Sequence, residues 1–366
     1  MSAALEARSS GIPLVGLVGT VTPLELVIAA GAMPVSVMGR AEDWGVSVDP
    51  MEEGHEPEIS SLFRQATTGF LDCLDLLVVP STSDGYRYLY PYLKEMQRQG
   101  LGECIPTIVP YDFLFGEAPA VQRHSRTVMR DLCTRLAVLT GKAVTDAALA
   151  QAIELTNQTR QQVRKLQGLR AVGQVSGADA HRMVRATAFA DVASYAEVLT
   201  SILATQAADP RPAKAPRLLL ISAVPLYHER LHEVLEFSGA LVIAEDDEWG
   251  SRRGSPDISV EGAPMEALFA HARTYTVSPR MLQAEREAWA CAQMQSGMYD
   301  GVVFYIPPCD QFFGWRYPDL DAVAAANGLP TLLIREDVLD AAAGPAIKQA
   351  SNRFIDGLVD SKKVPS

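Results

Sequence analysis

A cysteine and an aspartate follow directly behind a strongly apolar stretch in the last third of the chain. Residues 302–306 (Val-Val-Phe-Tyr-Ile) have the pattern of a strand that is buried on both faces. Pro307 and Pro308 end this strand, because neither ring nitrogen can donate to a sheet. Cys309 and Asp310 therefore lie at the carboxyl end of a strand, the edge where open parallel sheets bind ligands. A cysteine that only fills space near the sheet rim is an equal alternative.

A second strand edge carries hydroxyl and carboxyl groups. Residues 75–80 are predicted to form a strand, and Ser83 and Asp84 follow within the polar segment 81–85. These two residues either line a site or simply cap the next helix. A carboxylate beside Cys309 disfavours its thiolate, so a nucleophilic role for this thiol needs a nearby cation, for which Arg87 and Arg316 are candidates.

The first helix brings another carboxylate near a strand end. Pro23 suits the first turn of this helix, Thr22 is predicted to cap it, and Gly31 suits its exit. Glu25 then lies in the first turn, where its charge favours the helix dipole. This structural role is favoured for Glu25, and the alternative is that it faces the site.

Charged residues also follow the strand predicted at residues 240–244. Asp246 and Asp247 are expected to organise a loop by pairing with Arg252, and this role is favoured over substrate contact. Arg252 and Arg253 are further candidates for binding a phosphate, because a guanidinium matches phosphate oxygens.

Two sets of rings have both structural and functional interpretations. His228 and His232 are spaced i, i+4 on one helix, and two half-exposed helical histidines are favoured over a metal pair. Trp315, Phe312 and Phe313 could form the wall of a pocket, but a position in the core is favoured.

Strands and helices alternate in both halves of the chain, which predicts an α/β fold with two Rossmann-like, doubly wound parallel-sheet domains and an intervening helical segment. The boundary between the halves is the polar, proline-rich segment before residue 217. The expected organisation is a flexible N-terminus at 1–12, a first α/β domain at 13–116, a helical segment at 117–204, a linker at 205–216 and a second α/β domain at 217–366.

Composition excludes several classes of protein. The chain has 366 residues and a formal net charge of −12, which argues against general nucleic-acid binding. Its five cysteines form no CxxC pair, as expected in a reducing cytoplasm, and no apolar run has the length of a membrane span. The fingerprints of NAD-binding and P-loop nucleotide sites are absent.

Four stretches carry a family likeness. Residues 23–34 (PLELVIAAGAMP) resemble the PxELxxAAGxxP signature of the 2-hydroxyacyl-CoA dehydratase/benzoyl-CoA reductase family. Residues 79–84, 245–252 and 300–310 fall where that family has its other landmarks. The resemblance covers nearly the whole chain.

The resemblance implies a subunit of a cytoplasmic heterodimer that acts on an acyl-CoA thioester, either by dehydration or by reduction. It also implies a [4Fe–4S] cluster, a homologous partner subunit and an ATP-dependent activator that supplies an electron. Thiolates suit such clusters. Arg252 and Arg253 would then be candidates for the phosphates of CoA.

This sequence departs from the family pattern at the cluster ligands. The family normally supplies three cysteines, whereas here only Cys309 remains. Ser83 replaces the second, and Glu56 lies near the position of the first, so both are weak oxygen-ligand candidates. Three interpretations stay open: a subunit whose cluster is weakly held or carried by its partner, a cluster-free enzyme using Ser83, Asp84, Cys309 and Asp310, or a non-catalytic scaffold subunit.

Overall fold

The chain folds into two compact units. The computed structural model describes residues 2–40, 57–101, 104–187, 192–205, 215–276, 283–310 and 313–361. Unit 1 comprises Met1–Thr159, Thr187–Tyr195 and Pro256–Leu282, and unit 2 comprises Arg160–Ala186, Ala196–Ser255 and Gln283–Ser366. Most of the expected linker, residues 206–214, lies outside the described residues.

Unit 1 is built on a parallel sheet with the strand order β2-β1-β3-β4. Its central strands are completely buried, which is the reason that their sequences are almost continuously apolar. Successive side chains of β1 point to opposite faces, so Val15 and Leu17 join one core while Leu14 and Val18 join the other. The strands are β1 Leu14–Val18, β2 Met33–Val37, β3 Leu76–Pro80 and β4 Thr107–Tyr111.

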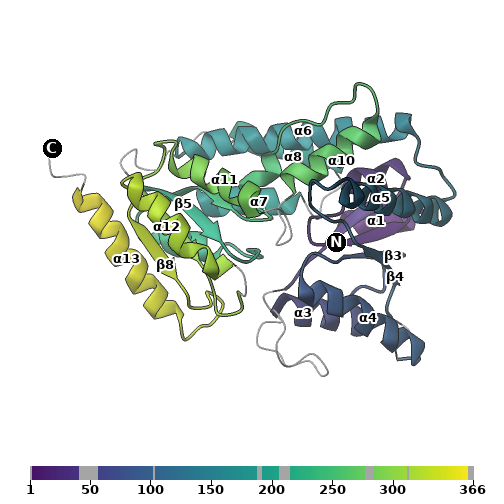
Figure 1. The fold of residues 1–366 in the computed structure, drawn as a ribbon, viewed down its shortest axis with the longest axis horizontal. Helices are drawn as coiled ribbons and strands as arrows, with labels where there is room; N and C mark the ends of the chain where they lie inside the picture. Colours follow the sequence, from purple (N-terminus) through teal and green to yellow (C-terminus); the bar gives the residue numbers. More distant parts are fainter. Residues whose placement is uncertain are drawn as a thin grey trace. The chain divides into compact units, whose positions relative to one another are not determined.

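Helices cover both faces of the unit 1 sheet, with α3 and α4 on one side and α2 and α5 on the other (Figure 1). The core on the α2 side also takes in the amino-terminal part of α6 and one side of α10. The helices are α2 Leu24–Ala29, α3 Pro57–Thr67, α4 Asp84–Arg98, α5 Pro119–Thr140, α6 Asp146–Ala171 and α10 Pro264–Tyr275.

The amino-terminal region contains a helix that the sequence analysis did not predict. Helix α1 (Ser2–Ser9) has an alanine-rich sequence with a high helix propensity, and Arg8 donates a hydrogen bond to the carbonyl of Cys73. The predicted Thr22 cap of α2 is wrong, since α2 has no side-chain cap and Pro23 is its N-cap residue. Gly31 does end this helix, with a φ of 78° that favours glycine.

Unit 2 repeats the same architecture. Its parallel sheet has the order β6-β5-β7-β8, the same pattern of strand positions as in unit 1. The strands are β5 Arg217–Ser222, β6 Leu241–Asp246, β7 Gly301–Tyr305 and β8 Thr331–Ile334. The predicted fold class, two doubly wound parallel sheets flanked by helices, is therefore confirmed.

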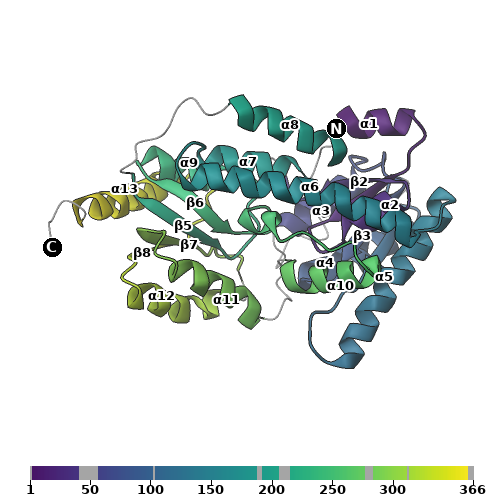
Figure 2. The ribbon, with the colours of Figure 1, turned by 90° about the horizontal axis from the view of Figure 1, so that it is seen from above.

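The unit 2 sheet is also covered on both faces, with α9 and α13 on one side and α11 and α12 on the other (Figure 2). Helix α7 packs against α9 and β6. Gly177 permits this close approach, because a Cβ there would come within 2.5 Å of the Val242 carbonyl oxygen. The helices are α7 Gly177–Ala186, α9 Arg230–Phe237, α11 Gln283–Met294, α12 Tyr317–Ala326 and α13 Gly344–Ser361.

The part of the sequence between the two sheets contains α5, α6, α7 and α8 (Val192–Thr205) in the described residues. Thr145 accepts a hydrogen bond from the amide of Ala148 at 3.2 Å, so its side chain caps the first turn of α6. Among the described helices, none combines the length and the apolar character needed to cross a membrane.

Candidate functional site

The strand order gives each sheet one topological switch point. In unit 1 the chain leaves β1 toward β2 and then crosses back to β3, so the switch point lies between β1 and β3. In unit 2 the equivalent point lies between β5 and β7. Ligands of open parallel sheets bind beside the carboxyl ends of the strands at such points. Ser83 follows β3 and Cys309 follows β7, so both lie near a predicted ligand edge.

In unit 2, Asp310 organises the backbone that follows Cys309. Its two carboxylate oxygens accept hydrogen bonds from the amides of Phe313 and Gly314, at 3.0 and 2.7 Å. These bonds hold the short helix η3 (Phe313–Trp315) at the carboxyl end of β7. The structure therefore gives Asp310 a positioning task, while Cys309 is half-buried beside it.

The two aromatic residues of η3 differ in burial. Phe313 is buried in the core, as expected, whereas the favoured core position of Trp315 is wrong because its side chain is 84% exposed. The short helix held by Asp310 turns Trp315 outward. Phe312 lies outside the described residues.

Arg316 is engaged by two carboxylates. Its guanidinium forms a fork on Glu287, with distances of 2.6 and 2.8 Å, and also lies 3.0 Å from Asp319. The Glu287 side chain raises the pKa of Arg316 by hydrogen bonding. A role for Arg316 as the cation that activates Cys309 would require it to give up these contacts.

In unit 1, Ser83 caps helix α4. Its Oγ accepts a hydrogen bond from the amide of Tyr86 at 3.1 Å, and its backbone is extended as an N-cap requires. Asp84 and Arg87 form an exposed pair on the first turn, with an Oδ1–Nη1 distance of 3.6 Å. Of the two interpretations of Ser83, the structure shows the helix cap. Asp84 and Arg87 are accessible to solvent.

The Ser83→Ala substitution is expected to lower the free energy of unfolding by about 1 kcal/mol, because one amide of the first turn loses its acceptor. Urea unfolding followed through α4 by hydrogen exchange measures this change. Ser83→Asp supplies another capping oxygen and is the matched control that should retain stability. An unchanged stability in Ser83→Ala would contradict the capping role.

Glu25 is buried at the start of α2. It is only 2% exposed and accepts a hydrogen bond from Thr156 Oγ1 on α6 at 2.9 Å. Burial raises the pKa of Tyr111 at the end of β4, and electrostatic repulsion from Cys133, once ionised at alkaline pH, and from Glu25 adds to this effect. Glu25 is therefore a buried carboxylate near the carboxyl edge of the unit 1 sheet. Glu56 lies outside the described residues.

The loop after β6 contains the expected pairing of Arg252. This guanidinium lies 3.1 Å from Asp246 and 4.9 Å from the ring centre of Trp289, and its side chain is nearly buried. A phosphate would have to compete with these contacts. Arg253 is half-buried, and its guanidinium lies 5.5 Å from the ring centre of Trp249.

Beneath this loop, unit 2 contains a buried polar cluster that the sequence did not reveal. Arg170 on α6 binds Glu245 at the end of β6 and donates to the Val242 carbonyl at 2.7 Å. His232 lies 3.2 Å from the same Glu245 carboxylate. We call Arg170, His181, His232, Glu245 and Asp247 the buried cluster of unit 2.

The second half of this cluster is centred on Asp247. Its carboxylate contacts His181 at 3.2 Å and accepts hydrogen bonds from the backbone amides of Leu226 and Trp249. His181 and His232 stack with ring centres 4.6 Å apart, and both are fully buried. The expectation of two half-exposed histidines is therefore wrong for His232.

The donors near the motif positions do not fit an iron–sulfur cluster. Such clusters are bound by thiolates, and the described motif positions offer one thiol at Cys309 and the capping hydroxyl of Ser83. Within the described ranges, no three His, Cys, Asp or Glu side chains are grouped so as to hold a metal ion.

The other cysteines do not replace the missing ligands. Cys133 is packed against the core, and burial raises its pKa to about 11, so it is a neutral thiol near neutral pH. Burial followed by the charge of Glu287 also raises the pKa of Cys291. Cys104 is exposed and Cys73 lies in the turn between α3 and β3.

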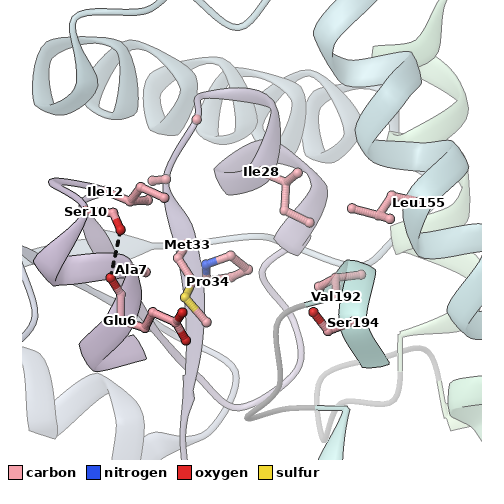
Figure 3. A pocket seen from close by; sticks show the side chains of 12 residues that line it. Glu6, Ala7, Ser10, Ile12, Ile28, Met33, Pro34, Leu155, Val192 and Ser194 are labelled. Carbon is pink, nitrogen blue, oxygen red and sulfur yellow. Dashed lines mark hydrogen bonds between the residues drawn. The ribbon is translucent and has the colours of Figure 1, made fainter. Parts of the chain in front are cut away.

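A pocket of about 450 Å³ lies elsewhere in unit 1 (Figure 3). Glu6 of α1 and Ser10, which follows that helix, line it together with Met33 at the start of β2 and Leu155 of α6. Because Met33 begins its strand, this pocket is at the amino end of the sheet. None of the predicted site residues is among those that line it.

Two four-stranded parallel sheets, each with polar residues at its switch point, define a Rossmann-like α/β protein with a candidate ligand edge in each unit. The chain belongs to the family of the 2-hydroxyglutaryl-CoA dehydratase D-component, whose model matches residues 19–354. The family resemblance inferred from the sequence is thereby confirmed.

Individual relatives support the same family. The chain is 20% identical over 337 residues to the (R)-phenyllactyl-CoA dehydratase beta subunit of Clostridium sporogenes, covering 90% of this chain and 88% of that protein. It is 24% identical over 302 residues to one of the subunits of the benzoyl-CoA reductase of Thauera aromatica, covering 79% of this chain and 76% of that protein. Both names describe subunits of enzymes that act on a CoA thioester.

Proposed function

We propose that this chain is a subunit of a cytoplasmic complex that acts on an acyl-CoA thioester, and that the [4Fe–4S] cluster is held by a homologous partner subunit. The observation that carries this proposal is the donor set at the motif positions. Ser83 replaces a family thiolate, and its Oγ serves as the N-cap of α4. Cys309 alone retains a thiol, which is too few soft ligands for a cluster in this chain.

The role proposed for this subunit is to bind and orient the thioester. Arg87 is suited to contact CoA phosphates, because its pair with Asp84 is exposed and 3.6 Å long, and such pairs are weak. Arg253 is a second candidate in unit 2, whereas Arg252 is held by Asp246. An ATP-dependent activator would supply the electron to the partner's cluster.

Cys309 and Asp310 are proposed to shape the ligand edge of unit 2. Asp310 fixes the backbone of η3 through two hydrogen bonds and so determines the position of the residues beyond Cys309. Glu25 is proposed as a buried carboxylate of the edge of unit 1, held by Thr156. None of these tasks requires an iron ligand from this chain.

Anaerobic iron and acid-labile sulfide analysis tests this proposal. The chain purified alone is expected to contain no cluster iron, because it supplies too few thiolates, while the complex with its natural partner is expected to contain a full cluster. Cys309→Ser is the informative variant, and it should leave the iron content of the complex unchanged. Stoichiometric iron on the lone chain that disappears in Cys309→Ser would place the cluster here and overturn the proposal.

A further inference from the structure

Unit 1 brings together three polar side chains that no sequence motif connects. Ser81 is the first residue after β3, and Asp112 is the first residue after β4. The Ser81 hydroxyl donates a hydrogen bond to Asp112 Oδ1. Because these strands are neighbours and parallel, both residues lie at the carboxyl edge of the sheet, the edge at which such folds bind ligands.

His124 on α5 completes this group. Its Nε2 lies 3.3 Å from Asp112 Oδ2 and 3.0 Å from the Asp112 carbonyl oxygen. Carboxylate and carbonyl oxygens only accept hydrogen bonds, so Nε2 carries a hydrogen, and the tautomer of the ring that this selects presents a lone pair at Nδ1. Among the described residues, Nδ1 has no hydrogen-bond partner, and the side chain is 44% exposed.

The backbone around His124 is held independently of Asp112. The neighbouring Ser125 is fully buried, and its hydroxyl bonds to both the amide and the carbonyl of Leu114 at 2.9 Å. This contact ties the first turns of α5 to the segment that follows β4. A histidine of fixed tautomer, with a carboxylate behind one nitrogen and an accessible base at the other, is the geometry of a general acid–base catalyst.

We propose that Ser81, Asp112 and His124 form a proton-transfer site for acyl-CoA thioesters that bear a hydrogen beside the carbonyl, and that this site works in the lone chain. The C–H bond breaks, the proton passes to His124 Nδ1, and the electron pair moves into the thioester carbonyl as an enolate. Return of a proton from the imidazolium restores the thioester, so the exchange consumes no oxidant or reductant. Asp112 stabilises the imidazolium, and Ser81 holds Asp112 in position.

This inference takes its ligand class from the proposed function, and it requires neither the partner nor a cluster. Hydrogens beside a thioester carbonyl are acidic because the enolate charge is delocalised onto oxygen. His124 would be a catalytic residue of this exchange, whereas Asp112 and Ser81 would be positioning residues.

Deuterium exchange into butyryl-CoA tests the proposal. The lone chain, incubated with butyryl-CoA in deuterated water, is expected to introduce deuterium at the carbon beside the carbonyl, as measured by mass spectrometry. His124→Gln should lower the rate by at least about 100-fold, because it removes the base. Asp112→Asn should also lower it, and added imidazole should restore part of the rate to His124→Ala, which a merely structural role would not allow.

His271→Gln is the matched control, since this histidine lies on α10 of the same unit with Nε2 3.2 Å from the Pro256 carbonyl. It should leave the exchange rate unchanged, and circular dichroism should show each variant folded. Should His124→Gln be misfolded, the His124→Asn variant takes its place. Exchange no faster than in buffer, or equal exchange in the His124 variant, would overturn the inference. Iron content and activity of the complex report on the proposed function separately.

Discussion

Replacing Arg170 by methionine is expected to destabilise unit 2 by about 3–5 kcal/mol, because the buried Glu245 carboxylate would lose its ion-pair partner. Arg170 is 1% exposed and Glu245 is fully buried, so water cannot replace the lost contact. The guanidinium also donates to the Val242 carbonyl, which would lose this donor. Burial raises the pKa of Glu245, but Arg170 and then His232 outweigh this effect and keep the carboxyl ionised.

Hydrogen exchange of the amides in β5, β6 and β7 measures this loss for unit 2 alone, which is necessary in a chain with two compact units. Arg182→Met is the matched control, because Arg182 is 51% exposed and pairs with Asp179 at the surface, where such pairs contribute little. Adding Glu245→Gln to Arg170→Met should recover part of the stability, since it removes the uncompensated charge. Equal effects of Arg170→Met and Arg182→Met would contradict the argument.

The sheets could be predicted from the sequence because each strand is indicated by a short run of consecutive apolar residues. A strand that is buried on both faces must be almost continuously apolar, and the residue that follows it is then known to lie at the sheet edge. For this reason the segment 300–310 identified both the strand β7 and the position of Cys309. The family likeness rested on equally local stretches, and the family model confirms it.

The groups that depend on contacts distant in sequence could not be predicted. Ser81 and Asp112 are 31 residues apart, and Arg170 and Glu245 are 75 apart, so no spacing pattern joins them. A charged residue in a predicted helix is ordinarily assigned to the surface, as an arginine such as Arg170 would be. Arg170 and Glu245 are buried because α6 and α9 pack against the carboxyl end of β6, and this packing is visible only in the structure.

Trp315 is the reverse case, a residue that was predicted to lie in the core and is exposed. Its apolar ring favoured a core position, but the orientation of η3 depends on two hydrogen bonds that Asp310 accepts from backbone amides. Such a cap is compatible with many turns, so the sequence cannot say which of Phe313 and Trp315 points inward. The candidate edges were thus predictable, whereas the side chains that they present required the structure.

Acidification is expected to destabilise unit 2 well above the pH at which exposed carboxylates titrate. Burial, as the largest effect, lowers the pKa of His232 to about 3, and burial together with Arg230 lowers that of His228 to about 4. In the unfolded chain both histidines bind protons at about pH 6.5. Between these values the unfolded state binds more protons than the folded state, so stability falls as the pH falls.

The size of this effect follows from the linkage between proton binding and folding. His232 alone should remove about 1.4 kcal/mol for each pH unit, which amounts to about 3 kcal/mol between pH 6.5 and pH 4. Nearly all of this loss occurs above the folded-state pKa, where His232 is still neutral. His228 adds to the loss over the same range, but by less, since its pKa is lowered only to about 4.

Hydrogen exchange of unit 2 at pH 7, 6 and 5, corrected for the intrinsic exchange rate, checks this slope. His232→Gln is the informative variant, because it cannot become charged yet can still donate a hydrogen bond toward Glu245. In this variant the unfolding free energy of unit 2 should depend less steeply on pH, by the contribution of one histidine. His271→Gln, from outside the cluster, should leave the slope unchanged. A His232→Gln protein with the wild-type slope would mean that His232 is already protonated in the folded state. The stacked pair with His181 would then carry a positive charge in a buried site. The carboxylates of Glu245 and Asp247 would have to compensate this charge, and Glu245 would do so while also pairing with Arg170.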